Sequence, residues 1–428
     1  MVAKTRRKGT SRTKSRKKTR KTTTKKSVSK AKKQKKVVFI VVDGLADTVQ
    51  NGKTPLSEAK KPNIDWLAAN GACGELMLII KPLWEEIDQK GVSQYANVNL
   101  LGYNPSKYPL KRGPLEAVGS GVPYREGHLA VRCNFATVDK EMHITDRRAG
   151  RNTCGLDEIA RYINQHVRIG AKHVFMRTYG HRAVLIIKKR LSDEIKGNDT
   201  GEGQIVGRIE AIAPEAEESA KLVQEFVDKS RNMIHFHPKN SERIDRGLPP
   251  ANYILIRQAG NQLFALPEFA KRWKIKKAVC IAENGVMKAT CMLAGFSSIN
   301  VPEFDNHSKW LDYIFENIDS ALAEYDFVYA HIKGADEAAH DKDFERKKKV
   351  IEDIDMHLGD LKNFDGIIVL TCDHITSSQR GTHEYGPVPV LVYGKKKDPV
   401  KTFDEKHVQE GSLGRKSGRE LLKFIFGR

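Results

Sequence analysis

The chain has 428 residues, of which 39% are hydrophobic and 30% are charged, and its formal net charge at pH 7 is +21. This length exceeds that of one ordinary hydrophobic core, so we expect either one large domain with an insertion or two domains. No apolar run approaches the roughly 18 residues of a membrane span, and the N-terminus lacks the apolar stretch of a secretory signal, so the sequence predicts a cytoplasmic protein without a membrane anchor.

The excess of basic residues is concentrated at the N-terminus. Residues 1–36 contain 18 Lys or Arg and no acid, whereas the rest of the chain has 56 basic and 53 acidic residues. A segment with so few apolar side chains cannot offset its ordering entropy by burial, so we expect it to be disordered. Two interpretations stay open, a solubilising or adventitious tail and an anchor for RNA, DNA or another polyanion.

From Val37 onward, short β-branched runs alternate with helical patterns, which predicts an α/β fold with a mostly parallel sheet and helices on both faces. In chain order the clearest elements are a strand at 37–42, helices at 62–70 and 215–229, strands at 327–332, 366–371 and 388–393, and a helix at 418–426.

The middle of the chain predicts an inserted smaller α/β lobe. It carries its own strand-like runs, HVFMRTY and AVLIIKK, and a Gly-rich polar stretch, GNDTGEGQ. The phrase GLPPANYILIR, which begins at Gly247, is expected to start the return to the first lobe. We therefore expect a metal-binding core from residues 37–110 and 255–428, and a substrate-binding lobe from residues 111–254.

Three of the predicted strands run directly into loops that carry acids or histidines. Ligands bind at the carboxyl ends of the strands in an open α/β sheet, so these side chains should converge on one place. Each motif alone is more often a helix cap or an ordinary histidine, but their conjunction indicates two divalent ions that could bind the attacking and leaving oxygens of a phosphoryl transfer. The side chains are Asp43, Asp336, His340, Asp373, His374 and His383.

These motifs and their flanks resemble the archaeal-type 2,3-bisphosphoglycerate-independent phosphoglycerate mutases of the alkaline phosphatase superfamily. The similar phrases include VVDGLAD, LGY, HIKGADEAAH, RGPLEAVG, VRCNFATVD, ITDRRAGR and GLPPANYILIRQAG, and they span about residues 37–394. The resemblance implies an alkaline-phosphatase-like fold and interconversion of 3-phosphoglycerate and 2-phosphoglycerate through a phosphoserine. It also implies two divalent metal ions, which would be Mn²⁺, Co²⁺, Zn²⁺ or Mg²⁺.

The resemblance further implies a role for individual residues. One ion would be surrounded by Asp43, Ser93, Asp373 and His374, and the other by Asp336, His340 and His383. Ser93 would be the nucleophile, although its place before a helical stretch also suits a helix N-cap. His331 is interpreted as structural. The cationic side chains expected to bind phosphoglycerate are Arg112, Arg132, Arg147, Arg148, Arg151, Lys333 and, more weakly, Lys288.

The chain departs from the family pattern beside the nucleophile, where Gln94 and Asn97 replace an Asp and a His. This change removes an ionisable pair and leaves three functions open. They are the mutase itself, another phosphomutase, phosphatase or phosphodiesterase with the same metals, and a degenerate non-catalytic member whose basic tail binds nucleic acid. Chemically suitable residues at all seven expected ligand positions favour catalysis.

Overall fold

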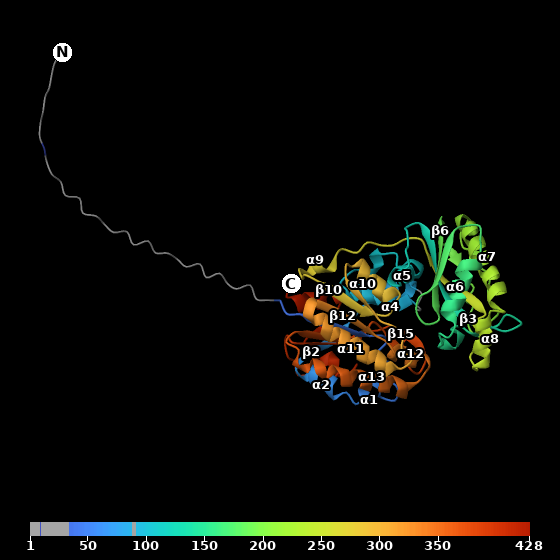
Figure 1. The fold of residues 1–428 in the computed structure, drawn as a ribbon. Coiled ribbons are helices and arrows are strands. Elements are labelled where there is room, and N and C mark those ends of the chain that lie inside the picture. The colour runs from blue at the N-terminus through green and yellow to red at the C-terminus, as the bar shows by residue number, and fades with distance from the viewer. Residues whose placement is uncertain (1–8, 10–33, 88–90) are drawn as a thin grey trace, which may run out of the picture. The chain divides into compact units, whose positions relative to one another are not determined.

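The computed structural model describes residue 9, residues 34–87 and residues 91–428, and Lys35–Arg428 form one compact unit. Most of the basic segment 1–36 therefore lies outside the described residues, and its expected disorder stays a prediction. Two β-sheets, each with its own hydrophobic cluster, organise the compact unit (Figure 1).

The larger sheet has eight strands in the order β11-β10-β12-β1-β13-β16-β2-β17. Strand β1 lies between β12 and β13, to which it is parallel, and its Val, Ile and Phe side chains are buried along its whole length because helices cover both faces of the sheet. β16 is antiparallel to both of its neighbours, so the sheet is mostly parallel, as predicted. The strands are β1 (Val37–Val42), β2 (Gly71–Leu76), β10 (Ala278–Ala282), β11 (Ser297–Asn300), β12 (Phe327–Ile332), β13 (Ile367–Thr371), β16 (Val388–Tyr393) and β17 (Gly414–Lys416).

Helices cover both faces of the larger sheet, which confirms the predicted fold class. α2 and α11 contact its strands and pack with α13 on one face, while α10 contacts β10 and packs with α4 on the other (Figure 1). The predicted helices at 62–70 and 418–426 are α2 and α14. The helices of this part of the chain are α1 (Pro55–Glu58), α2 (Pro62–Ala69), α3 (Lys81–Glu86), α4 (Val92–Leu100), α9 (Phe269–Trp273), α10 (Val286–Leu293), α11 (His307–Glu324), α12 (Ala335–His340), α13 (Phe344–Leu358) and α14 (Gly418–Phe426).

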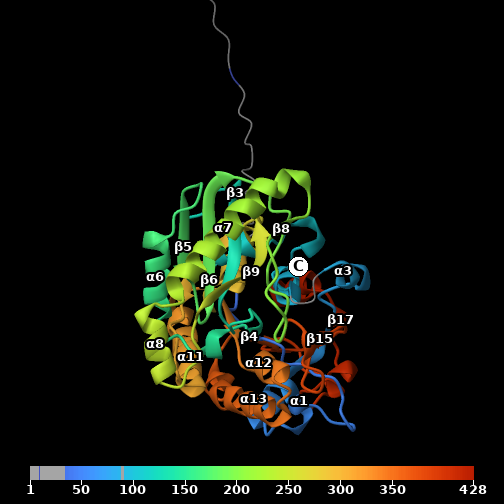
Figure 2. The ribbon, with the colours of Figure 1, turned by 90° about the vertical axis from the view of Figure 1, so that its right-hand side faces the viewer.

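The smaller sheet has five strands, and β3 pairs with β4, β6 and β9. Figure 2 shows β3, β5, β6 and β9 with α7 in front of them. The strands are β3 (His128–Val138), β4 (Ile144–Asp146), β5 (His173–Arg177), β6 (Arg182–Arg190) and β9 (Tyr253–Gly260), and short β7 (Ile195–Lys196) pairs with β8 (Glu210–Ala211). Helices α5 (Arg112–Gly119), α6 (Leu156–His166) and α7 (Glu217–Ile234) contact strands of this sheet, and α8 (Pro238–Asp245) packs against α6.

The placement of β9 corrects one expectation. The segment GLPPANYILIR was expected to begin the return to the first lobe. It instead leads into β9, which pairs with β3 in the smaller sheet. Its continuous apolar run, Tyr253 to Ile256, did not reveal which sheet it joins, because both sheets bury such strands. The predicted domain boundaries themselves stay a prediction.

Helix α5 joins the two sheets. It contacts β3, β6 and β9 of the smaller sheet and also α10, which covers the larger sheet. The approach is so close that a Cβ added at Gly119 would lie 1.9 Å from the carbonyl oxygen of Gly285, the residue before α10. The side chains of α5 are therefore held between the two sheets. Across the described residues, no helix combines the length and hydropathy that a membrane span requires.

Candidate active site

Two triads of carboxylates and histidines lie where β1, β12 and β13 end. Strand β1 lies between β12 and β13 and is parallel to both, so the carboxyl ends of the three strands meet at one edge of the sheet. Within each triad the potential ligand atoms lie within 4.8 Å of one another. The first triad is buried and consists of Asp43, Asp373 and His374, and the second is half-buried and consists of Asp336, His340 and His383. The structure thus brings together the six side chains that the sequence analysis grouped.

The histidines are oriented by hydrogen bonds from their outer nitrogens. His340 Nδ1 lies 2.7 Å from the carbonyl oxygen of Gly381, and His374 Nδ1 lies 3.0 Å from Thr376 Oγ1, which in turn donates to Asp336 at 2.8 Å. With Nδ1 as the donor in both rings, Nε2 faces the carboxylates. His340 Nε2 lies 3.5 Å from Asp336 Oδ2, and His374 Nε2 lies 3.2 Å from Asp43 Oδ1. This is the arrangement that a metal-binding imidazole requires.

The electrostatics favour the ionised forms of Asp43 and Asp336, whose pKa values are held below the ordinary value. Burial tends to raise the pKa of Asp43, but the neighbouring Lys333 and His374 hold that pKa well below its ordinary value. Burial tends to lower the pKa of His374, but the carboxylates around it, led by Asp373, raise that pKa to about 9. The pair of triads therefore concentrates negative charge that a divalent cation would neutralise.

Gly44 brings the two triads next to each other. Its φ is +62°, and a Cβ at this position would lie 2.6 Å from Thr376 Oγ1 and 2.9 Å from the Cβ of Asp336. The backbone N–H of Asp336 donates to the carbonyl oxygen of Asp43 at 3.0 Å. Only glycine leaves room for this approach of the first loop to α12.

Ser93 lies beside the buried triad. It is the second residue of α4, whose N-cap is Gly91, so the alternative role of an N-cap serine is wrong. Its Oγ lies 2.9 Å from His374 Nε2. Asn97, one turn further along α4, donates to Asp373 Oδ2 at 3.1 Å and accepts a hydrogen bond from Tyr329. Asn97 thereby orients a carboxylate of the triad.

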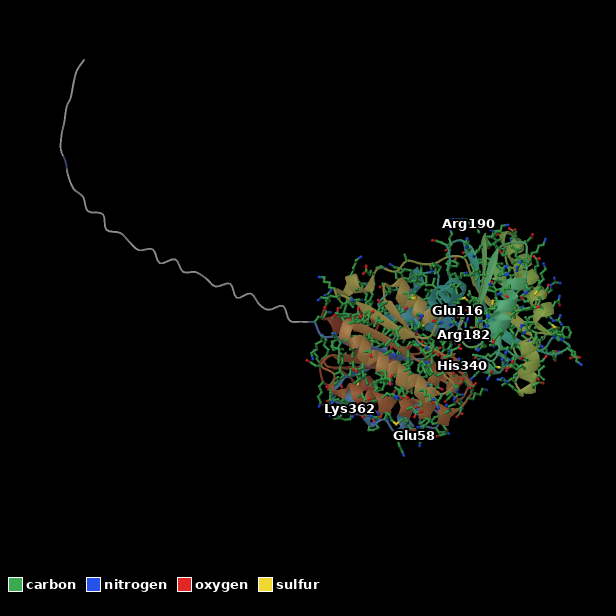
Figure 3. All side chains as sticks on the ribbon, in the orientation of Figure 1. Glu58, Glu116, Arg182, Arg190, His340 and Lys362 are labelled. Carbon is green, nitrogen blue, oxygen red and sulfur yellow. The ribbon has the colours of Figure 1, made fainter. Side chains whose placement is uncertain are left out.

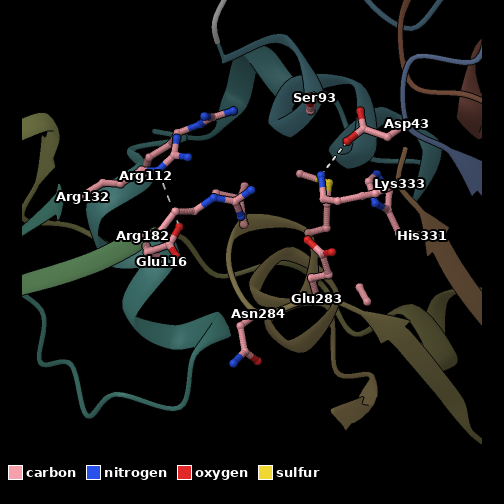
Figure 4. A pocket seen from close by; sticks show the side chains of 13 residues that line it. Asp43, Ser93, Arg112, Glu116, Arg132, Arg182, Glu283, Asn284, His331 and Lys333 are labelled. Carbon is pink, nitrogen blue, oxygen red and sulfur yellow. Dashed lines mark hydrogen bonds and ion pairs between the residues drawn. The ribbon is translucent and has the colours of Figure 1, made fainter. Parts of the chain in front are cut away.

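Cationic side chains face Ser93 across a cavity (Figure 4). The cavity has a volume of about 90 Å³ and adjoins a cleft of about 1130 Å³. Lys333 Nζ lies 2.6 Å from Asp43 Oδ2 at the edge of the cavity. The side chains that line both the cavity and the cleft are Asp43, Ser93, Arg112, Arg132, Arg182, Glu283 and Lys333. An anion that reaches Ser93 would therefore be surrounded by guanidinium and ammonium groups.

The positive charge in this cavity is only partly neutralised. Burial and the neighbouring Arg112 hold the pKa of Arg132 well below its ordinary value, and Glu116 offsets this only in part. The nearest charged contact of Arg132 is 3.8 Å long, from its Nε to Glu116 Oε2. Burial raises the pKa of Glu283, although Lys333 acts to lower it. The cavity thus favours a ligand with negative charge.

The structure does not bring every predicted residue to the site. Arg148 and Arg151 line the cleft, but Arg151 makes a bidentate ion pair with Asp341 at 2.7 and 2.9 Å. Arg147 pairs with Asp199 and does not line the cavity or the cleft.

Lys288 also lies outside the cavity and the cleft. Its Nζ donates to the side chains of Asn284 and Asn300, and burial lowers its pKa. Conversely, His331 was interpreted as structural, yet it lines the cavity, and its Nε2 lies 3.7 Å from Asp373 Oδ2. Its side chain is therefore part of the site.

Three charged residues that line the cavity were not predicted from the sequence, namely Arg182, Glu116 and Glu283. Figure 3 shows Arg182 and Glu116 where the elements of the two sheets meet. Arg182 begins β6 opposite Asn134 of β3, two residues from Arg132. A single Arg at the start of a strand carries no signal of its own. Only the pairing of β6 with β3 reveals its proximity to Arg132.

We expect Gly44→Ala to weaken Mn²⁺ binding by about tenfold or more, because the added methyl group displaces Asp336 and Thr376 from their positions. Calorimetric titration of the chelator-treated protein with Mn²⁺ measures the effect. Gly52→Ala is the matched control, since Gly52 also has a positive φ, of 81°, but has open space around it. Equal Mn²⁺ affinity in both variants would contradict the importance of the close approach.

Comparisons with known proteins agree with this geometry. Residues 35–427 match a family model described as the metalloenzyme superfamily. The chain is 38% identical over 410 residues to the 2,3-bisphosphoglycerate-independent phosphoglycerate mutase 1 of Methanothermobacter thermautotrophicus, covering 91% of this chain and 97% of the relative. It is 35% identical over 415 residues to the protein of the same name from Methanocaldococcus jannaschii, covering 92% and 97%.

Two solved structures share the fold. The PH0037 protein from Pyrococcus horikoshii is 27% identical, with a TM-score of 0.72 and coverage of 92% of this chain and 98% of that chain. The cofactor-independent phosphoglycerate mutase from Thermoplasma acidophilum is 29% identical, with a TM-score of 0.57 and coverage of 92% and 99%. The resemblance inferred from the sequence motifs is thus confirmed over nearly the whole chain. The chain belongs to the 2,3-bisphosphoglycerate-independent phosphoglycerate mutase family of the metalloenzyme superfamily.

Proposed function

We propose that the chain interconverts 3-phosphoglycerate and 2-phosphoglycerate through a phosphoserine at Ser93. One observation carries the proposal. Ser93 Oγ lies 2.9 Å from His374 Nε2, at the boundary between the acidic triads and the cationic cavity. A nucleophile at this boundary can accept a phosphoryl group while the carboxylate of the substrate stays among the arginines. The reaction belongs to glycolysis and gluconeogenesis, so we place the enzyme in the cytoplasm.

We propose further that each triad holds one divalent ion, with Ser93 adjoining the first. Carboxylate oxygens and imidazole nitrogens are donors that Mn²⁺, Co²⁺ and Zn²⁺ accept, and Mg²⁺ accepts the carboxylates. Bound ions would supply the positive charge that stabilises a transferring phosphoryl group and its attacking and leaving oxygens. The buried carboxylates of Asp43 and Asp373 and the orientation of the histidine Nε2 atoms support this assignment.

The proposed reaction has two successive phosphoryl transfers, in which different side chains have different roles. In the first, a bond forms between Ser93 Oγ and phosphorus, and the bond from phosphorus to the substrate oxygen breaks. The glycerate then turns while Arg112, Arg132 and Arg182 retain its carboxylate. In the second, the other hydroxyl oxygen of the glycerate takes the phosphoryl group and frees Ser93. Exclusion of water from the cavity separates this outcome from hydrolysis by a phosphatase.

The measurement that tests this function is a coupled assay for 2-phosphoglycerate with added Mn²⁺, run beside a measurement of released phosphate. We expect mutase turnover without phosphate release. Asp373→Asn and His340→Ala should abolish turnover and lower bound metal, because neighbouring groups cannot replace a missing ligand. Phosphate release in place of 2-phosphoglycerate would establish a phosphatase. Full metal content and full turnover in either variant would remove the two-ion assignment.

A second candidate function rests on the basic segment. Residues 1–36 contain 18 of the basic residues and no acid, which is a composition suited to binding RNA or DNA through the release of counterions. We propose that this segment anchors the enzyme to nucleic acid without sequence specificity. The retained triads argue against a role in which nucleic-acid binding has replaced catalysis.

Deletion of residues 1–36 should leave mutase turnover intact, because the site begins at Asp43, and should sharply weaken binding to nucleic acid. Binding of the full chain should also weaken steeply between low and high salt. Fluorescence anisotropy with a labelled RNA at two salt concentrations, for both forms of the protein, measures this. Equal affinity with and without the segment would contradict the anchor.

A further inference from the structure

Arg243 is a fully buried arginine on α8, and the proposed reaction does not use its side chain. Its guanidinium donates to four carbonyl oxygens, those of Ala149 at 2.6 Å, Cys154 at 2.7 Å, Pro249 at 2.9 Å and Asn152 at 3.0 Å. Burial of a charged group is costly unless its hydrogen bonds are made. Displacement of any of these carbonyl groups is therefore unfavourable.

Three of the four carbonyl groups belong to one short segment, residues 148–154, which begins two residues after β4. The segment bends around the guanidinium of Arg243, and its carbonyl oxygens at three positions point toward that guanidinium. Its side chains form part of the cleft wall, since both Arg148 and Arg151 line the cleft. The segment thus contacts a buried cation on one side and the cleft on the other.

The backbone of this segment needs support to keep its conformation. Residues 149–151 have φ values of +44°, +70° and +54°, and only the middle one is glycine. A left-handed φ is unfavourable for residues that carry a Cβ. Asp146 holds the same backbone, because its carboxylate accepts from the N–H of Arg148 at 2.6 Å and from that of Gly150 at 2.9 Å. The contacts of Asp146 and Arg243 together offset the strain.

Arg148 is the side chain of this segment that is best placed to bind an anion. Arg147 and Arg151 each form an ion pair with an aspartate, whereas Arg148 forms none with any residue that the structure describes. Burial, together with the neighbouring Arg151, lowers the pKa of Arg148, although two carboxylates offset part of this decrease. A partly desolvated cation beside a second cation favours an anionic ligand.

We propose that Arg243 is a positioning residue, which holds residues 148–154 in place and thereby directs Arg148 into the cleft to bind a negatively charged group of the substrate. The identity of that substrate rests on the proposed function. A guanidinium suits this role because its planar fork carries five N–H donors that reach carbonyl oxygens in several directions at once. A purely structural role of Arg243 would stabilise the fold without acting on affinity through Arg148.

The test is a double-mutant cycle on the binding of 3-phosphoglycerate to the Mn²⁺-loaded protein, measured by calorimetry. Arg243→Lys keeps the positive charge but has one nitrogen in place of three, so it cannot reach all four carbonyl oxygens. We expect it to raise the Kd by about tenfold, because a charged hydrogen bond to the ligand is misplaced. In an Arg148→Ala background the same change should have no further effect, because it acts through Arg148.

Gly150→Ala provides a second, independent variant in case Arg243→Lys destabilises the fold. Gly150 is exposed, but a Cβ there would lie 2.9 Å from Cδ of Pro249 and would displace the segment. Both variants should also speed amide hydrogen exchange within residues 148–154, measured without substrate, while Mn²⁺ content stays unchanged. Gly121→Ala is the matched control, since Gly121 has the same φ of +70° but has open space around it.

The proposal is overturned if the Kd in both variants equals that of the control, if hydrogen exchange in the segment is unchanged, or if Arg243→Lys weakens binding equally with and without the Arg148 side chain. A wild-type protein that neither binds nor converts 3-phosphoglycerate would contradict the proposed function. Hydrogen exchange needs no substrate, so faster exchange in both variants would still support the positioning of the segment, and unchanged exchange would overturn it.

Discussion

The site depends on one close approach of backbone to backbone, where the loop after β1 meets the start of α12. Asp336 N–H donates to the carbonyl oxygen of Asp43, and Gly44 has no side chain to hold the two segments apart. Lys347 also holds this loop in place. Its fully buried ammonium group donates hydrogen bonds to Asp47 and to the carbonyl oxygens of Ala46 and Thr376. An unpaired buried charge is costly, so this ion pair resists any displacement of the loop.

The carboxylates of the triads and the guanidinium groups of the cavity come from different parts of the fold. The carboxylates stand at the ends of strands in the larger sheet, whereas Arg132 and Arg182 come from β3 and β6 of the smaller sheet. Helix α5 contacts both parts and contributes Arg112 and Glu116 between them. The anionic side can hold cations and the cationic side can hold a substrate anion. Under the proposed function, a phosphoryl group that interacts with both cations and guanidinium groups would be held where the two sides meet.

The sequence could predict the strand-end residues because parallel adjacent strands must end at the same edge of a sheet. Hydrophobic patterns located β1, β12 and β16 with the bounds that the structure has. The presence of a residue near a family motif did not predict which group its side chain contacts. Arg147 turns to Asp199 although it stands within a similar motif, and Lys288, which stands outside the similar motifs, turns to two asparagines. Residues such as Arg182 enter the site through the register of the smaller sheet, which no local pattern encodes.

We infer that the two triads are two metal sites, the first of which adjoins Ser93. Crystals grown with Mn²⁺ and measured at the manganese absorption edge test it directly. We predict two anomalous peaks in each molecule, one between Asp43, Asp373 and His374 and one between Asp336, His340 and His383. The assignment of one ion to each triad is contradicted if these triads show no anomalous peak while Mn²⁺ binds elsewhere, for example at the exposed group of Asp139, Glu141 and His143.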